Sequence, residues 1–392
     1  MTTFEKPVII AARRTPLGRL GGSLRHLSVD ALAAPVLNAL VADGGIAAEE
    51  VDDVILGNAA GPGGNPARLS ALVAGFPLEV PGLTIDRQCG SGLEAINLAA
   101  RLIEAGAGDV YIAGGVESAS TAPWRLERPS SLYRMPRLYE RARVAPDSIG
   151  DPDMGVAAED VARHHGVSRE RQDRYALGSH LKAVAAQRSG RFDDEIVPVS
   201  DQAAGVVMVD ECPRADTSME RLAALPPAFV ADGRVTAGNS CPINDGAAAV
   251  LIVSASRFRS MGARVGLRVV ESAIAGVDPR LLGTGPIAST RELFARTTGL
   301  TMDAVDVVEF NEAFAGQVLA CLNALKIPES KVNLGGGAIA LGHPFGASGA
   351  VLVVRLFTEM VRGAKTPANA RIGLATLGIA GGLGISTLVE AI

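Results

Sequence analysis

The chain has 392 residues, of which 48% are hydrophobic and 20% are charged, and its formal net charge is −5. A chain of this length and apolar content can bury a large core and is not disordered. The negative total and the absence of a basic stripe make nucleic acid a poor partner. No apolar run is long enough to span a membrane, and the N-terminal apolar run is too short for a signal peptide.

The four cysteines lie far apart in the sequence and form no CxxC pair: Cys89, Cys212, Cys241 and Cys321. This spacing indicates neither a disulfide framework nor a metal site, and it fits a reducing compartment. We therefore expect a cytoplasmic protein that holds no metal and does not associate with a membrane.

Strands and helices alternate from the start of the chain, as the periodicity of apolar residues indicates. In chain order we expect a strand at residues 6–12, a helix at 29–45, strands at 51–59 and 82–88, a helix at 92–105 and a strand at 108–118. Short glycine-rich connections join them. Such alternation predicts an α/β protein with a largely parallel sheet that helices cover on both faces.

The last third of the chain repeats this order. Residues 305–314 resemble residues 51–60, and residues 370–382 match the strand at 108–118. Between them, residues 331–360 read as a strand, a glycine-rich turn and an apolar helix, like the segment that contains Cys89. A repeated order of elements predicts two related halves.

Residues 119–245 interrupt the pattern. This segment is rich in arginine, starts with loops that contain proline, and continues as a helical stretch with charges on one face. We interpret it as an inserted domain that closes over a site between the halves. The predicted division is residues 1–118 with 246–270, the insert at 119–245, and residues 271–392.

A reactive side chain precedes the apolar helix in each half: Cys89 in the first and His343 in the second. Repeat symmetry brings these two turns together. A thiol at a helix N-terminus has its thiolate stabilised by backbone N–H groups, and a nearby imidazole can take its proton. The alternatives are that Cys89 is inert core and that His343 caps its helix.

Three further features of the sequence are candidates for a functional site. Asn311, in "FNEAFAGQ", either holds a water or polarises an oxygen, or it is an ordinary N-cap. The neighbouring Glu312 reads as structural. The other four histidines read as solvated surface: His26, His164, His165 and His180. The glycine-rich stretch "LGGGAIALG" lacks the spacing of a dinucleotide-binding turn.

Taken together, the motifs resemble the thiolases, which transfer acyl groups between CoA thioesters. The resemblance covers essentially the whole length, and the stretches that carry it occur in the family's order: "RQCGSGLEA", "AGGVESAS", "RFDDEIVPV", "DGRVTAGNS", "NDGAAAV", "NEAFA" and "GGGAIALGHPFGASGA". It implies the thiolase fold, a duplicated five-layer α-β-α-β-α core with an inserted loop domain. It also implies a homo-oligomer, a dimer or a tetramer, with a place in fatty acid metabolism.

The resemblance implies roles for particular residues. Cys89 would accept the acyl group and His343 would activate it. His343, together with a water held by Asn311, would also form an oxyanion site for the CoA thioester. The backbone N–H groups of Cys89 and Ala380 would form an oxyanion hole. No permanent cofactor is implied; CoA and acyl-CoA are substrates, and the residues implied in binding them are Met154, Ala237, Ser240, Cys241 and Ile243.

One departure from the family stands at the last glycine-rich turn, "ATLGIAGGLGIS". Most thiolases have a second cysteine there, which is their acid and base, and this chain has Gly378. Cys321 is not an obvious substitute, because it lies well along the helix that follows Asn311.

Three functions stay open after this departure. The protein is a thiolase with an atypical acid and base, which cleaves 3-ketoacyl-CoA or runs the reverse Claisen condensation. Alternatively, it is a decarboxylating enzyme like a ketoacyl synthase, or an acyl-transfer enzyme, which needs no α-proton removal. The third possibility is a non-catalytic subunit that binds acyl-CoA.

Overall fold

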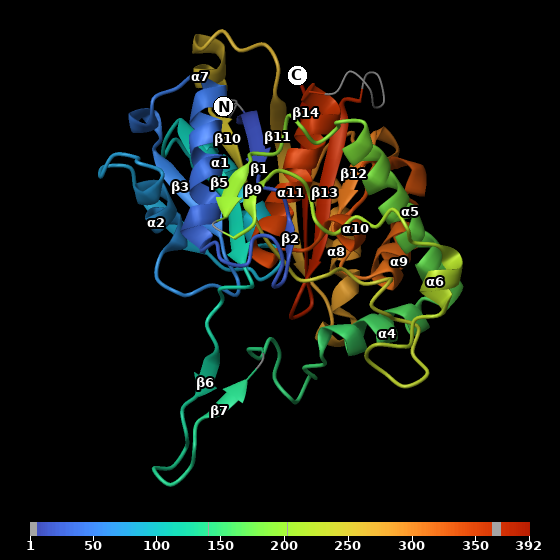
Figure 1. Cartoon of the computed structure of the whole chain (residues 1–392). Helices are drawn as coiled ribbons and strands as arrows, with labels where there is room; N and C mark the ends of the chain where they lie inside the picture. The colour runs from blue at the N-terminus through green and yellow to red at the C-terminus, as the bar shows by residue number, and fades with distance from the viewer. Residues whose placement is uncertain (1–5, 140, 202, 363–369) are drawn as a thin grey trace.

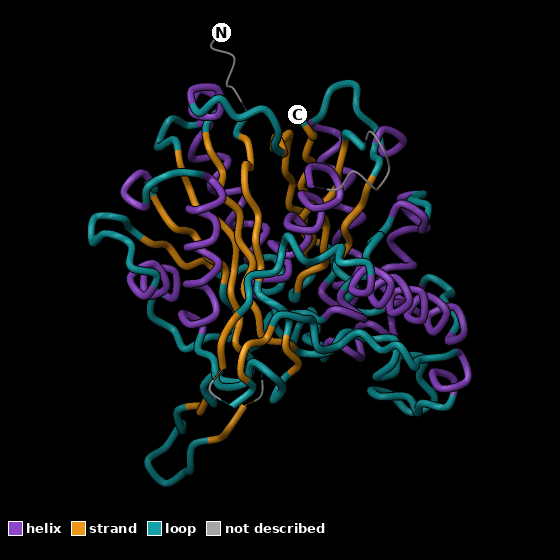
Figure 2. The backbone as a smooth tube through the Cα atoms, turned by 45° about the horizontal axis from the view of Figure 1, so that its top comes forward, coloured by secondary structure: helices purple, strands orange, loops and turns teal. Residues whose placement is uncertain are grey.

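The computed structural model describes residues 6–139, 141–201, 203–362 and 370–392. Within these residues the two halves of the chain contribute their strands to one sheet, which Figures 1 and 2 show crossing the molecule. No helix in the described ranges is long and apolar enough to cross a membrane.

The amino-terminal half supplies one end of the sheet, in the order β4-β3-β5-β10-β1. Its strands are β1 (Val8–Arg14), β3 (Asp53–Gly57), β4 (Gly82–Ile85), β5 (Val110–Ser118) and β10 (Asn244–Val253), with the short β2 (Gly18–Arg19) beside β10. β3 pairs in parallel with β4 and β5, whereas β10 is antiparallel to both of its main neighbours. Its helices are α1 (Val29–Gly44), α2 (Pro66–Val73), α3 (Ser91–Glu104) and α7 (Ala255–Ser260).

The carboxy-terminal half repeats this arrangement in the order β12-β13-β14-β11. Its strands are β11 (Leu267–Gly276), β12 (Val307–Phe310), β13 (Ile372–Ile379) and β14 (Leu383–Ala391), and its helices are α8 (Gly285–Arg296), α9 (Ala315–Leu325), α10 (Ala338–Leu341) and α11 (Phe345–Phe357). Parallel β12–β13 and antiparallel β13–β14 copy the pairing of β3, β5 and β10. The predicted duplication is therefore confirmed. The prediction of a largely parallel sheet is wrong, because β1, β10, β11 and β14 pair with their neighbours in antiparallel fashion.

The two halves also contain short turns of 3₁₀ or π helix. These are η1 (Ala48–Glu50), η2 (Pro279–Thr284), η3 (Met302–Ala304), η4 (Glu329–Lys331) and the π-helical turn η5 (Thr358–Arg362).

The layers follow from which face each helix covers. α3 and α11 contact each other and lie between the half-sheets, because α11 contacts β5 and β10 of one half and β13 of the other. α1 and α2 cover the outer face of the first half-sheet, and α8 and α9 that of the second (Figure 1). The largest buried apolar cluster surrounds α3 and α11. This order of layers confirms the predicted five-layer thiolase fold.

The half-sheets meet where β1 pairs with β11 at two positions, Val8 with Arg268 and Ile9 with Leu267. β11 is one strand that runs through residue 270, where the sequence places a domain boundary, and it pairs along its length with β14. This pairing favours a boundary before β11. The division into domains otherwise remains a proposal.

The inserted segment contains a projecting hairpin and a helical part that packs on the second half. The hairpin is formed by β6 (Arg125–Glu127) and β7 (Arg137–Tyr139) and extends away from the core in Figure 1. The other elements are α4 (Met154–His164), α5 (Arg169–Arg188), β8 (Val199–Asp201), β9 (Gly205–Val207) and α6 (Met219–Ala223).

The prediction that His180 is solvated surface is wrong. His180 is only 5% exposed, and its Nδ1 accepts a hydrogen bond from the backbone N–H of Arg214. Burial lowers the pKa of His180 to about 4. The reason is that one face of α5 is buried against the protein. This face includes Tyr175, Ser179 and Ala183, and His180 is buried beside them. His26 and His164 are exposed, as expected, and His165 is partly buried.

Candidate functional site

The turn before α3 carries Cys89 in a constrained backbone. Gln88 has φ of 49°, in the left-handed region that non-glycine residues seldom adopt. Its N–H donates to Asp86 Oδ1 at 2.7 Å. Ser91 Oγ accepts from the Arg87 N–H and donates to the Gln88 carbonyl oxygen at 2.6 Å. These bonds hold the turn, so the direction of Cys89 is fixed by the backbone rather than left to a flexible loop.

The thiol of Cys89 is held in its protonated form by burial. Burial raises the pKa of Cys89 to about 11, although the backbone N–H groups of Ala380 and of Cys89 itself oppose this shift. The sequence predicts a stabilised thiolate at the helix N-terminus; the structure differs, because desolvation of the charged sulfur outweighs those two N–H groups. The thiol therefore needs a base to become nucleophilic.

His343 lies in the turn between α10 and α11 and is 3% exposed. Its backbone N–H donates to Asn244 Oδ1, and its ring Nδ1 lies 2.6 Å from Ser348 Oγ. Since that hydroxyl donates to the Pro344 carbonyl oxygen, Nδ1 carries the proton toward Ser348 and Nε2 keeps a free lone pair. Burial lowers the pKa of His343 to about 4, so the imidazole is neutral at pH 7 and can accept a proton.

The two turns lie against one another, as the repeat predicts. A Cβ on Gly92, in the first turn of α3, would lie 2.7 Å from the Gly346 carbonyl oxygen at the start of α11. Reciprocally, a Cβ on Gly349 would lie 2.4 Å from the Leu93 nitrogen. Glycine therefore permits backbone contact between the two helices, and it brings their first turns together.

A cavity of about 600 Å³ opens beside these turns. Both turns contribute to its lining, through Cys89 and Phe345, and so does the base of the β6–β7 hairpin, through Arg125 and Tyr139. Met154 and Ala380 complete the part that concerns the predicted site. A ligand in this cavity would touch the thiol directly, and Met154 lies where the sequence predicts a ligand contact.

Asn311 and Gly378 come from the second half. Asn311 is 2% exposed, its backbone N–H donates to the Thr376 carbonyl oxygen, and its Nδ2 has no hydrogen-bond partner among the described residues. The N-cap of α9 is Phe314, so the N-cap interpretation of Asn311 is wrong. Gly378 lies in β13 opposite Gly384 of β14 and is partly exposed.

The segment predicted to bind CoA passes between the Asn311 and His343 turns. Ser240 forms a bridge with Phe314, the Cys241 N–H donates to the Ala313 carbonyl oxygen, and Ile243 forms a bridge with His343. Ala237 and Ile243 are exposed, whereas Ser240 is 9% exposed and its hydroxyl donates to the Thr236 carbonyl oxygen. None of the four predicted contacts lines the 600 Å³ cavity. Their role as ligand contacts stays a prediction.

Two buried carboxylates support the turns, and the sequence analysis assigned a role to only one of them. Glu312, expected to be structural, accepts hydrogen bonds from Tyr175, Ser179, Asn333 and the Ile339 N–H. Glu117, which the sequence analysis missed, is fully buried and accepts from Asn58, from the Ala59 and Ala60 N–H groups and from the Gly346 N–H. Each ties the end of one strand to the start of a helix. An isolated acidic residue at the end of an apolar strand, as in "GGVES", is the signal that could have identified Glu117.

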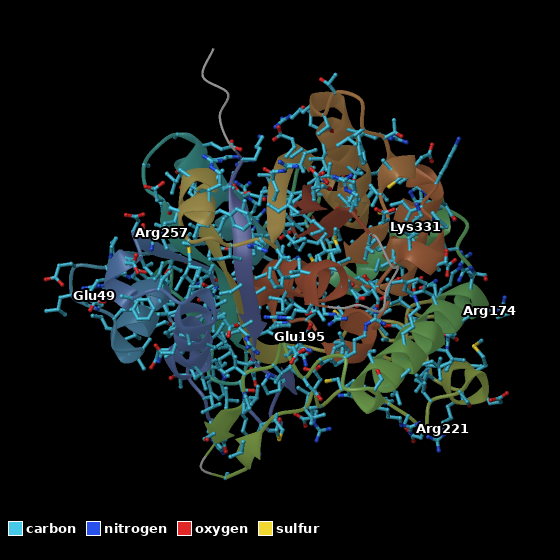
Figure 3. All side chains as sticks on the ribbon, turned by 90° about the horizontal axis from the view of Figure 1, so that it is seen from above. Glu49, Arg174, Glu195, Arg221, Arg257 and Lys331 are labelled. Atoms are coloured by element: carbon cyan, nitrogen blue, oxygen red, sulfur yellow. The ribbon has the colours of Figure 1, made fainter. Side chains whose placement is uncertain are left out.

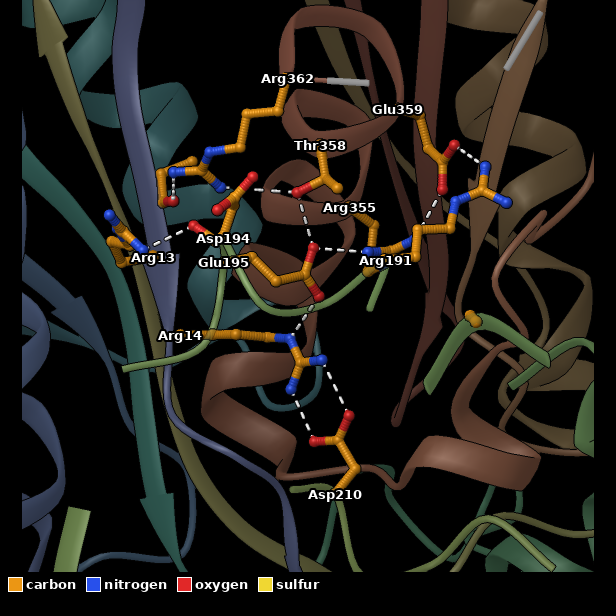
Figure 4. A network of polar contacts seen from close by, with 12 residues as sticks. Arg13, Arg14, Arg191, Asp194, Glu195, Asp210, Arg355, Thr358, Glu359 and Arg362 are labelled. Carbon is orange, nitrogen blue, oxygen red and sulfur yellow. Dashed lines mark hydrogen bonds and ion pairs between the residues drawn. The ribbon is translucent and has the colours of Figure 1, made fainter. Parts of the chain in front are cut away.

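A buried charge network ties the insert to both halves (Figure 4). Glu195 of the insert accepts from Arg14 of β1 and from Arg355 of α11, and Arg14 also pairs with Asp210. Arg355 pairs further with Glu359. Seen from above, Glu195 lies in the middle of the molecule, whereas the labelled Glu49 and Arg221 lie at its periphery (Figure 3). The network holds α11, and with it the His343 turn, in place.

The fold and the site together define a duplicated α/β protein with a thiol and a neutral imidazole in equivalent, contacting turns. Two family models match the chain: the thiolase N-terminal domain at residues 7–256 and the thiolase C-terminal domain at residues 264–391. The chain belongs to the thiolase family.

Individual relatives match over nearly the full length. A protein of Staphylococcus epidermidis named "Putative acetyl-CoA C-acetyltransferase VraB" is 44% identical over 389 residues, 99% of each chain. The Bacillus anthracis acetyl-CoA acetyltransferase structure has a TM-score of 0.93 and 39% identity, and it covers 99% of each chain. Human mitochondrial 3-ketoacyl-CoA thiolase in complex with CoA has a TM-score of 0.91 and 34% identity, with 99% of this chain and 98% of that chain covered.

Proposed function

We propose that the protein is an acyl-CoA C-acyltransferase that carries the acyl group on Cys89. The observation that carries this proposal is the contact between the two repeat-related turns, one with a protonated thiol and the other with a neutral imidazole. Membership of the thiolase family and the names of the relatives support the same reaction class. CoA thioesters are the proposed substrates, since the human structure is a complex with CoA. No permanently bound cofactor is part of the proposal.

In the proposed acylation step, His343 Nε2 takes the proton from the Cys89 thiol, and the sulfur attacks the thioester carbonyl carbon. The oxyanion that forms is stabilised by the N–H groups of Cys89 and Ala380, which already point at the sulfur. CoA then leaves and takes the proton back from His343. Asn311, with its unpartnered amide nitrogen, holds the water that binds the second thioester oxygen.

The reaction has two directions along one coordinate. Cleavage of a 3-ketoacyl-CoA leaves the shortened acyl chain on Cys89 for transfer to free CoA, and condensation runs the same steps backwards. A decarboxylating condensation is the second candidate, because Gly378 provides no side chain that could remove an α-proton. A subunit that only binds acyl-CoA is the third, and the hydrogen bonds that fix Gln88 and His343 argue against it.

The decisive experiment is mass spectrometry after incubation with acetyl-CoA. We expect an acetyl adduct on the peptide that contains Cys89 and none in Cys89→Ala. Cys212→Ser is a matched control, because it removes a partly buried thiol elsewhere and keeps an acceptor for Asn244. A wild-type protein without adduct would contradict both enzymatic candidates. Cleavage of acetoacetyl-CoA by free CoA supports thiolysis, whereas consumption of malonyl-CoA alone supports the decarboxylating candidate.

A symmetric homo-oligomer, a dimer or a dimer of dimers, is part of the proposal. Its first support is β4, an edge strand of the sheet with exposed Leu83, close to the exposed Val73 and Leu78. Its second support is the tip of the hairpin, where Leu132 is 100% and Tyr133 99% exposed. Exposed apolar groups of this kind are typical of contact surfaces. A cytoplasmic location is also proposed, because all four cysteines are free.

A further inference from the structure

A second, much smaller cavity of about 20 Å³ lies beside Gly378. It is enclosed by α4, the turn around η2, the start of α9 and the end of β13, through Ala158, Leu282, Gly283, Ala313, Phe314, Gln317 and Gly378. A cavity needs about 10–15 Å³ to hold a water molecule, so this one has room for a single water.

Gln317 provides the polar side of this cavity. It is 1% exposed, and neither its amide oxygen nor its amide nitrogen has a hydrogen-bond partner among the described residues. A Cβ built on Gly378 would lie 3.5 Å from Gln317 Nε2, which places the amide at the cavity wall. A buried amide is costly unless it is hydrogen-bonded, and one water in the cavity would satisfy both of its ends.

The cavity adjoins the acyl site through three segments. Gly378, near the end of β13, is two residues before Ala380, which lines the large cavity and whose backbone N–H is hydrogen-bonded to the Cys89 sulfur. Ala158 is one helical turn beyond Met154, which lines the large cavity. Gly378 is also partly exposed in a strand whose preceding residues are buried. A water in the small cavity would therefore border the place where an acyl group on Cys89 reacts.

We propose that Gln317 is a positioning residue that holds this water, and that the water is the proton donor to the carbanion released during cleavage. The inference rests on the proposed acyl-Cys89 function. It assigns to a bound water the proton transfer for which Gly378 offers no side chain.

When the bond between C2 and C3 of the 3-ketoacyl-CoA breaks, its electron pair stays on C2 of the departing acetyl-CoA as an enolate. The water gives a proton to C2, and the hydroxide left behind is neutralised from solvent through the partly exposed side of Gly378. An enolate of a thioester is a stronger base than hydroxide, so water suffices as the acid. In the opposite direction hydroxide must remove the α-proton, and condensation is correspondingly slow.

The two nearest thiols are poorer donors. Cys321, one turn further along α9, is fully buried and donates to the Gly283 carbonyl oxygen, so it has no access to the substrate. Cys241 is closer to the site, because its backbone N–H donates to the carbonyl oxygen of Ala313, which lines the small cavity. Burial raises the pKa of the Cys241 thiol. It does not line the small cavity. Cys241 is therefore the competitor that the experiment must distinguish.

The test measures two steps separately: exchange of the methyl protons of acetyl-CoA with D₂O, and acylation of Cys89. Gly378→Ala adds a methyl group whose contacts are ordinary, at 3.5 Å and beyond, and which takes the place of the water. We expect exchange to fall about 10²-fold, as for a lost acid or base, with acylation unchanged within about two-fold. Gln317→Leu should have the same selective effect.

Two matched controls test whether the effect is only structural. Gly178→Ala, in α5, adds a methyl group with nothing within 4 Å. Gln172→Leu removes a fully buried glutamine that is equally unpartnered but does not line the cavity. Both should leave exchange at the wild-type rate. Gly378→Cys should restore exchange to the wild-type rate or above, because the thiol is a proton donor in the same space.

Three results would overturn the inference. The first is wild-type exchange in Gly378→Ala, or no exchange in the wild type although Cys89 is acylated. The second is exchange in Gly378→Cys as slow as in Gly378→Ala, which would mean steric damage. The third is selective loss of exchange in Cys241→Ser, which would identify that thiol as the donor. A wild-type protein that does not acylate Cys89 would instead contradict the proposed function and this inference with it.

Discussion

At the residue scale, burial shifts the pKa values of the Cys89 thiol and the His343 imidazole in opposite directions. It raises the pKa of Cys89 to about 11 and lowers the pKa of His343 to about 4, because a charged form is disfavoured in both. The resting site therefore holds two neutral groups rather than a thiolate and an imidazolium. In the proposed mechanism, the proton moves from Cys89 to His343 only when a thioester is bound and the oxyanion hole can stabilise the product.

This arrangement predicts the pH dependence of acylation. His343 accepts a proton only while it is neutral, so the rate should fall as the pH drops through about 4, well below the ordinary value of 6.5. Rapid-quench measurement of Cys89 acylation between about pH 3 and pH 8 would reveal this limb. Circular dichroism at each pH must match the spectrum at pH 7, which excludes unfolding. An acidic limb centred near 6.5 would show that His343 is solvated or is not the base.

At the scale of elements, the charge network in Figure 4 connects three parts of the chain that are remote in sequence. Arg14, Glu195 and Arg355 are at most 1% exposed, and both guanidinium groups also lie over the ring of Phe192. A buried ion pair is weak evidence of net stability, but removing one partner leaves an uncompensated charge. The network therefore makes the position of α11 sensitive to a single change in the insert.

We expect Glu195→Gln to lower the free energy of unfolding by about 3–5 kcal/mol, because Arg14 and Arg355 each lose one of two buried carboxylate partners and the cluster keeps one uncompensated positive charge. Urea denaturation followed by circular dichroism would measure the loss. Glu292→Gln is the control: its pair with Arg296 is about half exposed and contributes no more than about 0.5 kcal/mol. Equal losses in the two variants would contradict a structural role for the network.

At the scale of the whole molecule, the repeat made the fold predictable. Similar strand–turn–helix patterns around Cys89 and His343 predict two halves with equivalent turns, and the structure has both. Contacts between side chains that are distant in the sequence could not be predicted, because no local sequence pattern indicates them. Glu117 is an example, because its partners come from the loop after β3 and from α11. The burial of His180 was not predicted, because the charged residues around it in the sequence obscure the apolar pattern of the buried face of α5. The pKa of Cys89 was not predicted, because the sequence does not show how far a side chain is desolvated.

The hairpin tip gives a prediction about assembly. Replacing Leu132, Tyr133 and Met135 with serine removes apolar groups that are 88–100% exposed and lie outside the residues that line the large cavity. We expect the oligomer to become smaller in analytical ultracentrifugation, with Cys89 still acylated by acetyl-CoA. Serine at the exposed Ile149 is a matched change elsewhere in the insert and should leave the mass unchanged. An unaltered sedimentation coefficient in the triple variant would exclude the tip as a contact.

The contact between α3 and α11 also has a consequence for biosynthesis. Cys89 emerges from the ribosome early, whereas His343 and α11, which follows it, belong to the last sixth of the chain. Until that stretch emerges, the sulfur has neither its proton acceptor nor the Ala380 amide, and a truncated product would carry it without reactivity toward thioesters. In the proposed mechanism, unfinished chains would therefore not trap acyl groups on Cys89.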